Sequence, residues 1–232
     1  MQRLKQRLGE VPRYGWVLGV FYLAFQYGLY LLADLLSHVL GTIDHAFVPK
    51  IPVLDDMIPV VPAFIVIYLF SYVFWVFGPI IASLTEKRNF LNYMIGLTAA
   101  YLIGFLIFVF APTYMDRTAE GLTEIAAQPG IFQQWMAIVH AADGGNLAFN
   151  LFPSYHCLSS LYCYLGIRKR EEVSRGIRVY SVIMTILICC STVLTKQHYL
   201  PDVAGGLGIA LVCYLIVQKV DPAGKILKKR EA

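Results

Sequence analysis

The chain has few charged residues. Asp, Glu, Lys and Arg make up 15% of its 232 residues, whereas hydrophobic residues make up 58%, and the mean hydropathy is +0.62. A soluble domain carries about 25% charged residues, so this composition excludes an ordinary soluble globular protein and indicates a polytopic membrane protein. The length allows one compact helical domain, which we expect to comprise residues 1–232.

Features that would indicate other classes are also missing. We find no internal repeat, nucleotide-binding loop or nucleic-acid motif, so no nucleic-acid partner is expected. The five cysteines all fall in apolar segments, which favours free, packed thiols over a disulfide framework. The first apolar segment lacks a small-residue cleavage site, so we predict an uncleaved membrane span there instead of a signal peptide.

Apolar segments recur along the chain and predict six membrane-spanning helices, at about residues 14–36, 60–83, 91–110, 153–167, 177–194 and 203–217. The fourth is short for a span, and we expect its end to be recessed in the protein. In the polar interval before it, Ile131, Trp135 and Ile138 have helical spacing, which predicts an amphipathic helix lying in the membrane interface. The predicted fold is an all-α membrane protein with six transmembrane helices and an interfacial helix between the third and fourth spans.

Positive charge is nearly absent from one side of this topology. With both termini cytoplasmic, all but three of the 19 Lys and Arg residues fall on the inner side, as the positive-inside rule requires. All five histidines fall on the outer side. The charge pattern therefore predicts an integral membrane protein, of the plasma membrane if bacterial or an endomembrane if eukaryotic, with its functional site at the outer or lumenal face. The three outer cations are Lys50, Arg117 and Lys196.

One histidine lies close to a carboxylate between the last two apolar segments. His198 and Asp202 are four residues apart, and Pro201 fits the first turn of a helix beginning near residue 200. Asp202 would then face back towards His198, which is how a carboxylate fixes a histidine tautomer and orients the ring. The alternative is an interfacial histidine beside a helix-capping aspartate.

A second histidine, His156, follows Pro153 and Ser154 at the start of the fourth predicted span. Free backbone N–H groups at such a helix N-terminus suit an anion, and His156 could donate a proton to it. Arg117 and Lys196 stand near the histidines in the predicted topology, and such cations commonly bind phosphate. The alternative is that these cations pair with nearby acids such as Asp116.

These residues resemble two signatures of the type 2 phosphatidic acid phosphatase superfamily of lipid phosphatases and phosphotransferases. Residues 153–156 match its second signature, Pro-Ser-x-His, and Ser191, His198 and Asp202 have the spacing of the third, Ser-Arg-x5-His-x3-Asp. The resemblance covers about residues 112–206. Thr192 replaces the arginine of the third signature, and only Arg117 matches the first, Lys-x6-Arg-Pro. In these departures the chain resembles the branch that includes inositol-phosphorylceramide and sphingomyelin synthases.

The resemblance implies a role for each site residue. His198 attacks the phosphorus, Asp202 holds and stabilises it, and His156 protonates the leaving alcohol oxygen. No cofactor is implied. No metal is expected either, because nearby cations would oppose a dication. The groups implied to bind the phosphoryl oxygens are Arg117, Ser154, the backbone N–H groups of Tyr155 and His156, Thr192 and Lys196, the last as a replacement for the missing arginine.

We therefore predict a metal-independent lipid-phosphate phosphatase that works through a phosphohistidine at the outer or lumenal face. The expected partners are a lipid phosphate and the bilayer, and no particular oligomeric state is predicted. One alternative is a phosphotransferase that moves a phospho-headgroup between a lipid and an alcohol such as inositol. Another is a non-catalytic transporter or scaffold, which explains the hydropathy but not the placement of the histidines.

Overall fold

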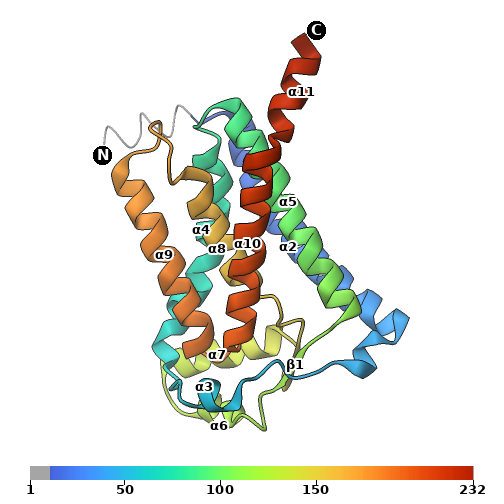
Figure 1. The fold of residues 1–232 in the computed structure, drawn as a ribbon. Helices are drawn as coiled ribbons and strands as arrows, with labels where there is room; N and C mark the ends of the chain where they lie inside the picture. Colours follow the sequence, from blue (N-terminus) through green and yellow to red (C-terminus); the bar gives the residue numbers. More distant parts are fainter. Residues whose placement is uncertain (1–10, 232) are drawn as a thin grey trace.

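The computed structural model describes residues 11–231, which are mostly helical, with the long helices arranged as a bundle (Figure 1). The described chain contains five helices that are long and apolar enough to cross a membrane: α2, α4 with the turn before it, α5, α9 and α10. The helix α8 is shorter, at 13 residues. The bundle helices are α2 (Arg13–Leu40), α4 (Ile65–Ala82), α5 (Lys87–Phe110), α8 (Tyr155–Ile167), α9 (Arg175–Leu194) and α10 (Leu200–Val220).

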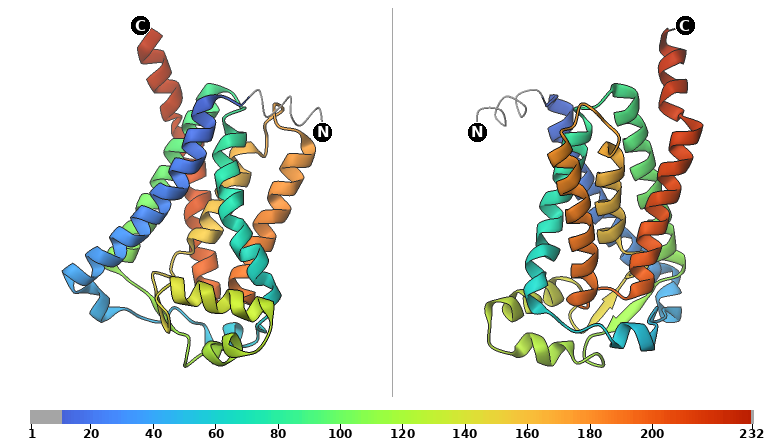
Figure 2. Two further views of the ribbon diagram at one scale, coloured as in Figure 1. Left: turned by 180° about the vertical axis from the view of Figure 1, so that it is seen from behind. Right: turned by 60° about the vertical axis from the view of Figure 1, so that its left-hand side comes forward.

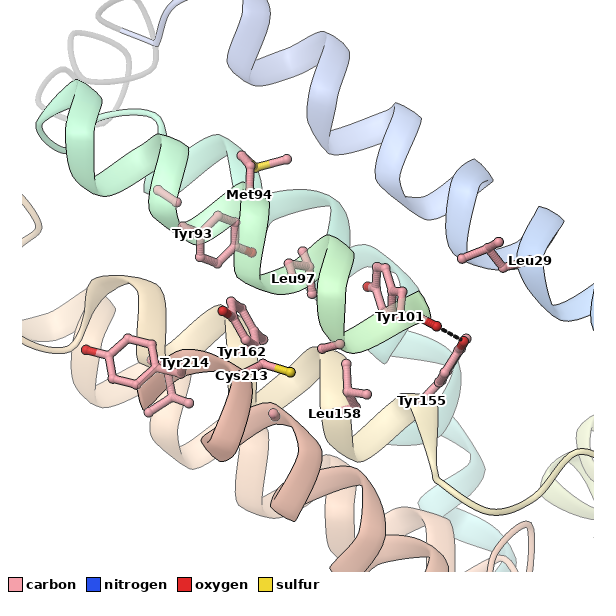
Figure 3. Close-up of a cluster of buried hydrophobic side chains, with 14 of the residues drawn as sticks. Leu29, Tyr93, Met94, Leu97, Tyr101, Tyr155, Leu158, Tyr162, Cys213 and Tyr214 are labelled. Atoms are coloured by element: carbon pink, nitrogen blue, oxygen red, sulfur yellow. Dashed lines mark hydrogen bonds between the residues drawn. The ribbon is translucent and has the colours of Figure 1, made fainter. Parts of the chain in front are cut away.

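The short helix α8 lies inside the bundle. All but two of its residues are buried, and it packs against α4, α5, α9 and α10. Figure 3 shows Leu158 and Tyr162 of α8 in a cluster with side chains of α5 and α10. Beside them, the Tyr155 hydroxyl donates a hydrogen bond of 2.6 Å to the carbonyl of Tyr101. The 13 residues of α8 fall short of the roughly 20 that an isolated helix needs to cross a bilayer.

Short elements cover one end of the bundle, which we call the cap (Figures 1 and 2). A two-stranded antiparallel sheet in the cap pairs Tyr114 with Phe149. This sheet departs from the all-α prediction, and it brings the residues after α5 beside those before α8. The cap comprises η1 (Thr42–His45), α3 (Pro52–Asp56), η2 (Pro62–Phe64), β1 (Tyr114–Asp116), α6 (Leu122–Ala127), α7 (Ile131–Ala142) and β2 (Leu147–Phe149).

At the opposite end, α11 (Pro222–Glu231) extends beyond the bundle (Figure 1). The helix α2 begins at this same end. The chain turns between α10 and α11 at Asp221, which has a left-handed backbone with a φ of 48°. The Arg88 guanidinium of α5 pairs with the Asp221 carboxylate at this turn. No membrane span was predicted for this segment.

Candidate functional site

A cavity of about 410 Å³ lies near the cap end of the bundle. Its apolar wall comes mainly from α2, α4, α7 and β2, while its polar residues come from α2, α8, the segments that follow α7 and β2, and the loop before α10. The polar residues that line it are Gln26, Tyr30, Asp34, Asp143, Asn150, His156, Gln197 and His198. Both histidines of the sequence motifs therefore face the same space.

His156 is held among aromatic rings in the first turn of α8. Its ring stacks on Tyr68 with 4.1 Å between centroids, and it meets Tyr72 and Trp75 edge-on. The ring of His198 lies 5.7 Å away, measured between centroids. Within the described residues, Nε2 of His156 is buried with no hydrogen-bond partner. A fixed ring with an unpaired nitrogen beside a cavity can donate a proton to a bound group.

His198 lies in the short connection between α9 and α10. Its backbone N–H donates to the carbonyl of Thr192 at 3.1 Å, and its Nδ1 is 3.5 Å from Oδ2 of the fully buried Asp202. That Oδ2 also accepts the N–H of Tyr199 at 2.8 Å, so Asp202 caps α10 and faces the imidazole at once. At 3.5 Å, this contact is longer than a typical hydrogen bond.

Ser154 joins the two histidine segments. Its backbone N–H donates to the carbonyl of Asp202 at 2.9 Å, and its hydroxyl caps α8 by accepting from the N–H of Cys157 at 3.4 Å. Gly206 permits the close approach of α10 to Ser154, because a Cβ at this position would lie 2.3 Å from the Ser154 carbonyl oxygen. The neighbouring Tyr155 turns its ring towards the cavity wall and the core.

Arg117 lies behind the cavity wall instead of lining it. Its guanidinium is 1% exposed and donates to the Asp143 carboxylate at 2.7 Å and to the Gln197 amide oxygen at 3.3 Å. It also donates to the backbone carbonyls of His140, Asp143 and Gly145. Its acidic partner is thus Asp143 and not Asp116. The described residues leave only its Nε without a partner.

The structure also places Lys196 and Thr192 outside the cavity lining. The Lys196 ammonium donates to the backbone carbonyl of Asp55 in α3, where burial lowers its pKa. The Thr192 hydroxyl donates to the carbonyl of Cys189 at 2.8 Å. Its own carbonyl accepts the N–H groups of Gln197 and His198. Thr192 therefore shapes the His198 loop through its backbone.

A family model described as the PAP2 superfamily matches residues 33–216. The chain belongs to the PAP2 superfamily. The match spans both histidine motifs, Asp202 and Arg117, and it confirms the resemblance inferred from the signatures. A search of curated proteins and a search of solved structures each found no match.

Several polar residues of the cavity in this PAP2 member were not predicted from the sequence, among them Tyr30, Asp143 and Asn150. Asp143 accepts a hydrogen bond of 2.6 Å from the Tyr30 hydroxyl, and Asn150 is buried beside the same space. No motif marks them, because they come from α2, the loop after α7 and the residue after β2. The one available signal was an asparagine placed three residues before Pro153 in an otherwise apolar stretch.

Proposed function

We propose that the protein is an integral membrane lipid-phosphate phosphatase. The observation that carries this proposal is the pair of buried histidine rings, 5.7 Å apart, lining one cavity with largely apolar walls. Nε2 of His156 has no hydrogen-bond partner in the part of the chain that is described, and Nδ1 of His198 faces the Asp202 carboxylate at 3.5 Å. A transporter or scaffold does not require this pairing, whereas phosphoryl transfer uses one nucleophile and one proton donor.

In the proposed reaction, Nε2 of His198 attacks the phosphorus while the bond from phosphorus to the lipid oxygen breaks. His156 gives its proton to the leaving oxygen, and Asp202 stabilises the charge that develops on His198. Water then cleaves the phosphohistidine and releases phosphate. The backbone N–H groups of Tyr155 and His156 stabilise the phosphoryl oxygens, because they have no partner within the helix, and Ser154, which is buried outside the cavity lining, positions this turn by capping α8. Arg117 contributes positive charge from behind the wall.

The apolar wall supports a lipid as the substrate. Tyr27 and Leu31 of α2 line the cavity, as do Leu69 and Tyr72 of α4. All four side chains are more than a third exposed. A cavity bounded by such residues gives an acyl or prenyl chain a path from the bilayer to the histidines. A small soluble phosphate ester has no apolar chain to pack against this wall.

The proposed orientation places the cap at the outer or lumenal face. The helix α2 starts and α11 ends at the other end of the bundle (Figure 1), which requires an even number of crossings. With five long helices, α8 then serves as the sixth crossing. In the cap, Ile131 and Ile138 of α7 are exposed, which supports an interfacial position for this helix.

Phosphate release from a panel of lipid phosphates tests the function. The purified protein would be assayed with phosphatidic acid, phosphatidylglycerol phosphate and polyprenyl diphosphate, with and without EDTA. We expect metal-independent release that His198→Asn abolishes. His45→Asn is the matched control, because His45 is exposed in η1 and does not line the cavity. Wild-type turnover by a folded His198→Asn variant would rule out the proposed mechanism.

A phosphotransferase is the second candidate. It is favoured by the polar group of Tyr30, Asp143 and Asn150 in the same cavity, since transfer to an alcohol needs a place for hydroxyl groups and hydrolysis does not. Absence of phosphate release by the folded wild type, together with formation of a phosphorylated alcohol, would establish this function instead.

A further inference from the structure

We infer that Asn150, Asp143 and Tyr30 form a second subsite of the cavity, which binds a hydroxyl-bearing group of the polyol class. This group belongs either to the headgroup of the lipid phosphate or to a separate alcohol that accepts the phosphoryl group. The inference rests on the proposed function, because the subsite and the two histidines line the same cavity.

Asn150 gives the first evidence for a ligand. Its side chain is 4% exposed, and neither Oδ1 nor Nδ2 has a hydrogen-bond partner within residues 11–231. Burying an unpaired amide is unfavourable, so such a group in a cavity indicates a partner that binds there. An amide offers both a donor and an acceptor, which matches the two roles of a hydroxyl group.

The backbone holds Asn150 at this position. Its φ is 60°, a left-handed conformation that asparagine tolerates better than most residues. Its N–H donates to the carbonyl of Thr113 at 2.8 Å, and the Thr113 hydroxyl accepts the next two N–H groups, those of Leu151 and Phe152. These hydrogen bonds fix the backbone, which keeps the Asn150 amide beside the cavity.

Asp143 and Tyr30 determine which kind of ligand fits. The Asp143 carboxylate accepts the Tyr30 hydroxyl at 2.6 Å and Arg117 at 2.7 Å, and each of its oxygens retains a further lone pair. It can therefore accept hydrogen bonds from a ligand, while its negative charge disfavours a second anion. Since Arg117 is already bonded to Asp143, a neutral, hydroxyl-bearing group suits this subsite and the phosphate suits the histidine side.

The size of the cavity agrees with this division. Ligand pockets commonly span about 300–1,000 Å³, and the present one is about 410 Å³. It has room for a phosphate beside the histidines and a small polyol beside Asn150, with an aliphatic chain leaving along the apolar wall.

Asn150→Asp tests the subsite, because aspartate retains the size and the backbone tolerance while it loses the amide donors. Asn146→Asp is the matched control, since Asn146 lies at the other end of β2, is exposed and does not line the cavity. The first arm compares kcat/KM for phosphatidylglycerol phosphate, which has a headgroup hydroxyl, with that for phosphatidic acid, which has none. The second arm adds glycerol or inositol to phosphatidic acid and measures the phosphorylated polyol.

If the hydroxyl group comes from the lipid, Asn150→Asp should reduce the preference for phosphatidylglycerol phosphate by about tenfold or more. If it comes from an acceptor, the wild type should form phosphorylated polyol and Asn150→Asp should lose it. Asn146→Asp should behave as wild type in both arms. Equal behaviour of the two variants in both arms would overturn the subsite. It would mean that the Asn150 amide binds only a structural water.

A binding measurement separates this inference from the proposed function. Stabilisation of His198→Asn by inositol or glycerol can be followed by thermal unfolding, with no turnover involved. Polyol-dependent stabilisation that is lost when Asn150→Asp is added would support the subsite even if the wild type releases no phosphate. Phosphate release by the wild type, with no polyol effect in any assay, would overturn the subsite and leave the phosphatase proposal intact.

Discussion

Gly206→Ala tests whether the close approach of α10 to α8 sets the geometry of the two histidine segments. A Cβ at this position would lie 2.3 Å from the carbonyl oxygen of Ser154 and 3.2 Å from the backbone nitrogen of Leu158. Both are backbone atoms, so no side-chain rotation can relieve the clash. The two helices must move apart at this point.

The required movement follows from the contact distance. Cβ atoms essentially never lie closer than 3.0 Å to another heavy atom, so the helices must separate by about 0.7 Å or more. This movement strains the 2.9 Å hydrogen bond from Ser154 to Asp202 and shifts His156 relative to His198. Since a misplacement of about 1 Å can reduce turnover by about 100-fold, we expect a loss of about 10- to 100-fold. Overpacking costs about 1–3 kcal/mol, partly offset by about 0.5–1 kcal/mol from replacing a helical glycine.

The control for this experiment is Gly208→Ala. Gly208 lies two residues further along α10, and a Cβ there meets no heavy atom within 4 Å. Phosphate release and thermal unfolding in detergent would be measured for both variants. We expect Gly208→Ala to retain wild-type turnover. Full turnover and unchanged KM in Gly206→Ala would refute the reasoning, and an equal loss in both variants would attribute the effect to α10 in general.

Three further predictions concern the cap. Asp55→Ala should lower the free energy of unfolding by about 2–3 kcal/mol, because the buried carboxylate accepts two backbone N–H groups, including that of Leu200 at 2.8 Å. Asp56→Ala is the control, because Asp56 is exposed, and it should lower the free energy of unfolding by less than about 1 kcal/mol. Thermal unfolding of both variants measures the difference. Burial, followed by the charge of Arg117, lowers the pKa of His140 to about 4. The folded state then binds fewer protons than the unfolded state, whose His pKa is about 6.5, so stability should fall as the pH drops from about 6.5 to 4, and His140→Gln should weaken that dependence. Arg117→Lys should lower both thermal stability and turnover, by about tenfold or more for turnover, because one ammonium cannot reproduce the bonds of the guanidinium; wild-type values would show that these bonds are dispensable.

The bundle helices were predictable because apolar runs mark them. The predicted ends at residues 110, 167 and 194 agree with the ends of α5, α8 and α9. Some starts were wrong for a physical reason. The third span was predicted from about residue 91, but α5 begins at Lys87, since charged residues are accommodated in a first turn that faces water. The second was predicted from about residue 60, but α4 begins at Ile65, after Pro62 has formed a 3-10 turn.

The short elements of the cap could not be derived in this way. β1 and β2 have three residues each and are about 30 positions apart in the sequence, so no local pattern reveals their pairing. The helix α11 has no long apolar face, and its basic residues resemble a tail. By contrast, the spacing of Ile131, Trp135 and Ile138 correctly predicted the helix α7, while its position in the membrane interface stays a prediction.

In the candidate site, local spacing predicted more than charge did. The structure places His198 and Asp202 near each other because they are four residues apart, with His198 just before α10 and Asp202 in its first turn. The partners of Arg117 and Lys196 are distant in sequence, at Asp143 and Asp55. The sign of a charge does not show which distant residue it pairs with. An uncharged buried residue such as Asn150 leaves no mark in the charge pattern at all.

The shortness of α8 has a consequence for how a lipid reaches the histidines. A helix of 13 residues is about 20 Å long, whereas the hydrocarbon layer is about 30 Å thick. If α8 is the sixth crossing, part of the missing length falls in front of His156, and the cap fills that space where lipid would otherwise be. The phosphate then has to leave the plane of the headgroups and descend towards the middle of the membrane before it meets the nucleophile. Under the proposed function, turnover would therefore depend on bilayer thickness and on the length of the lipid tail as well as on the headgroup.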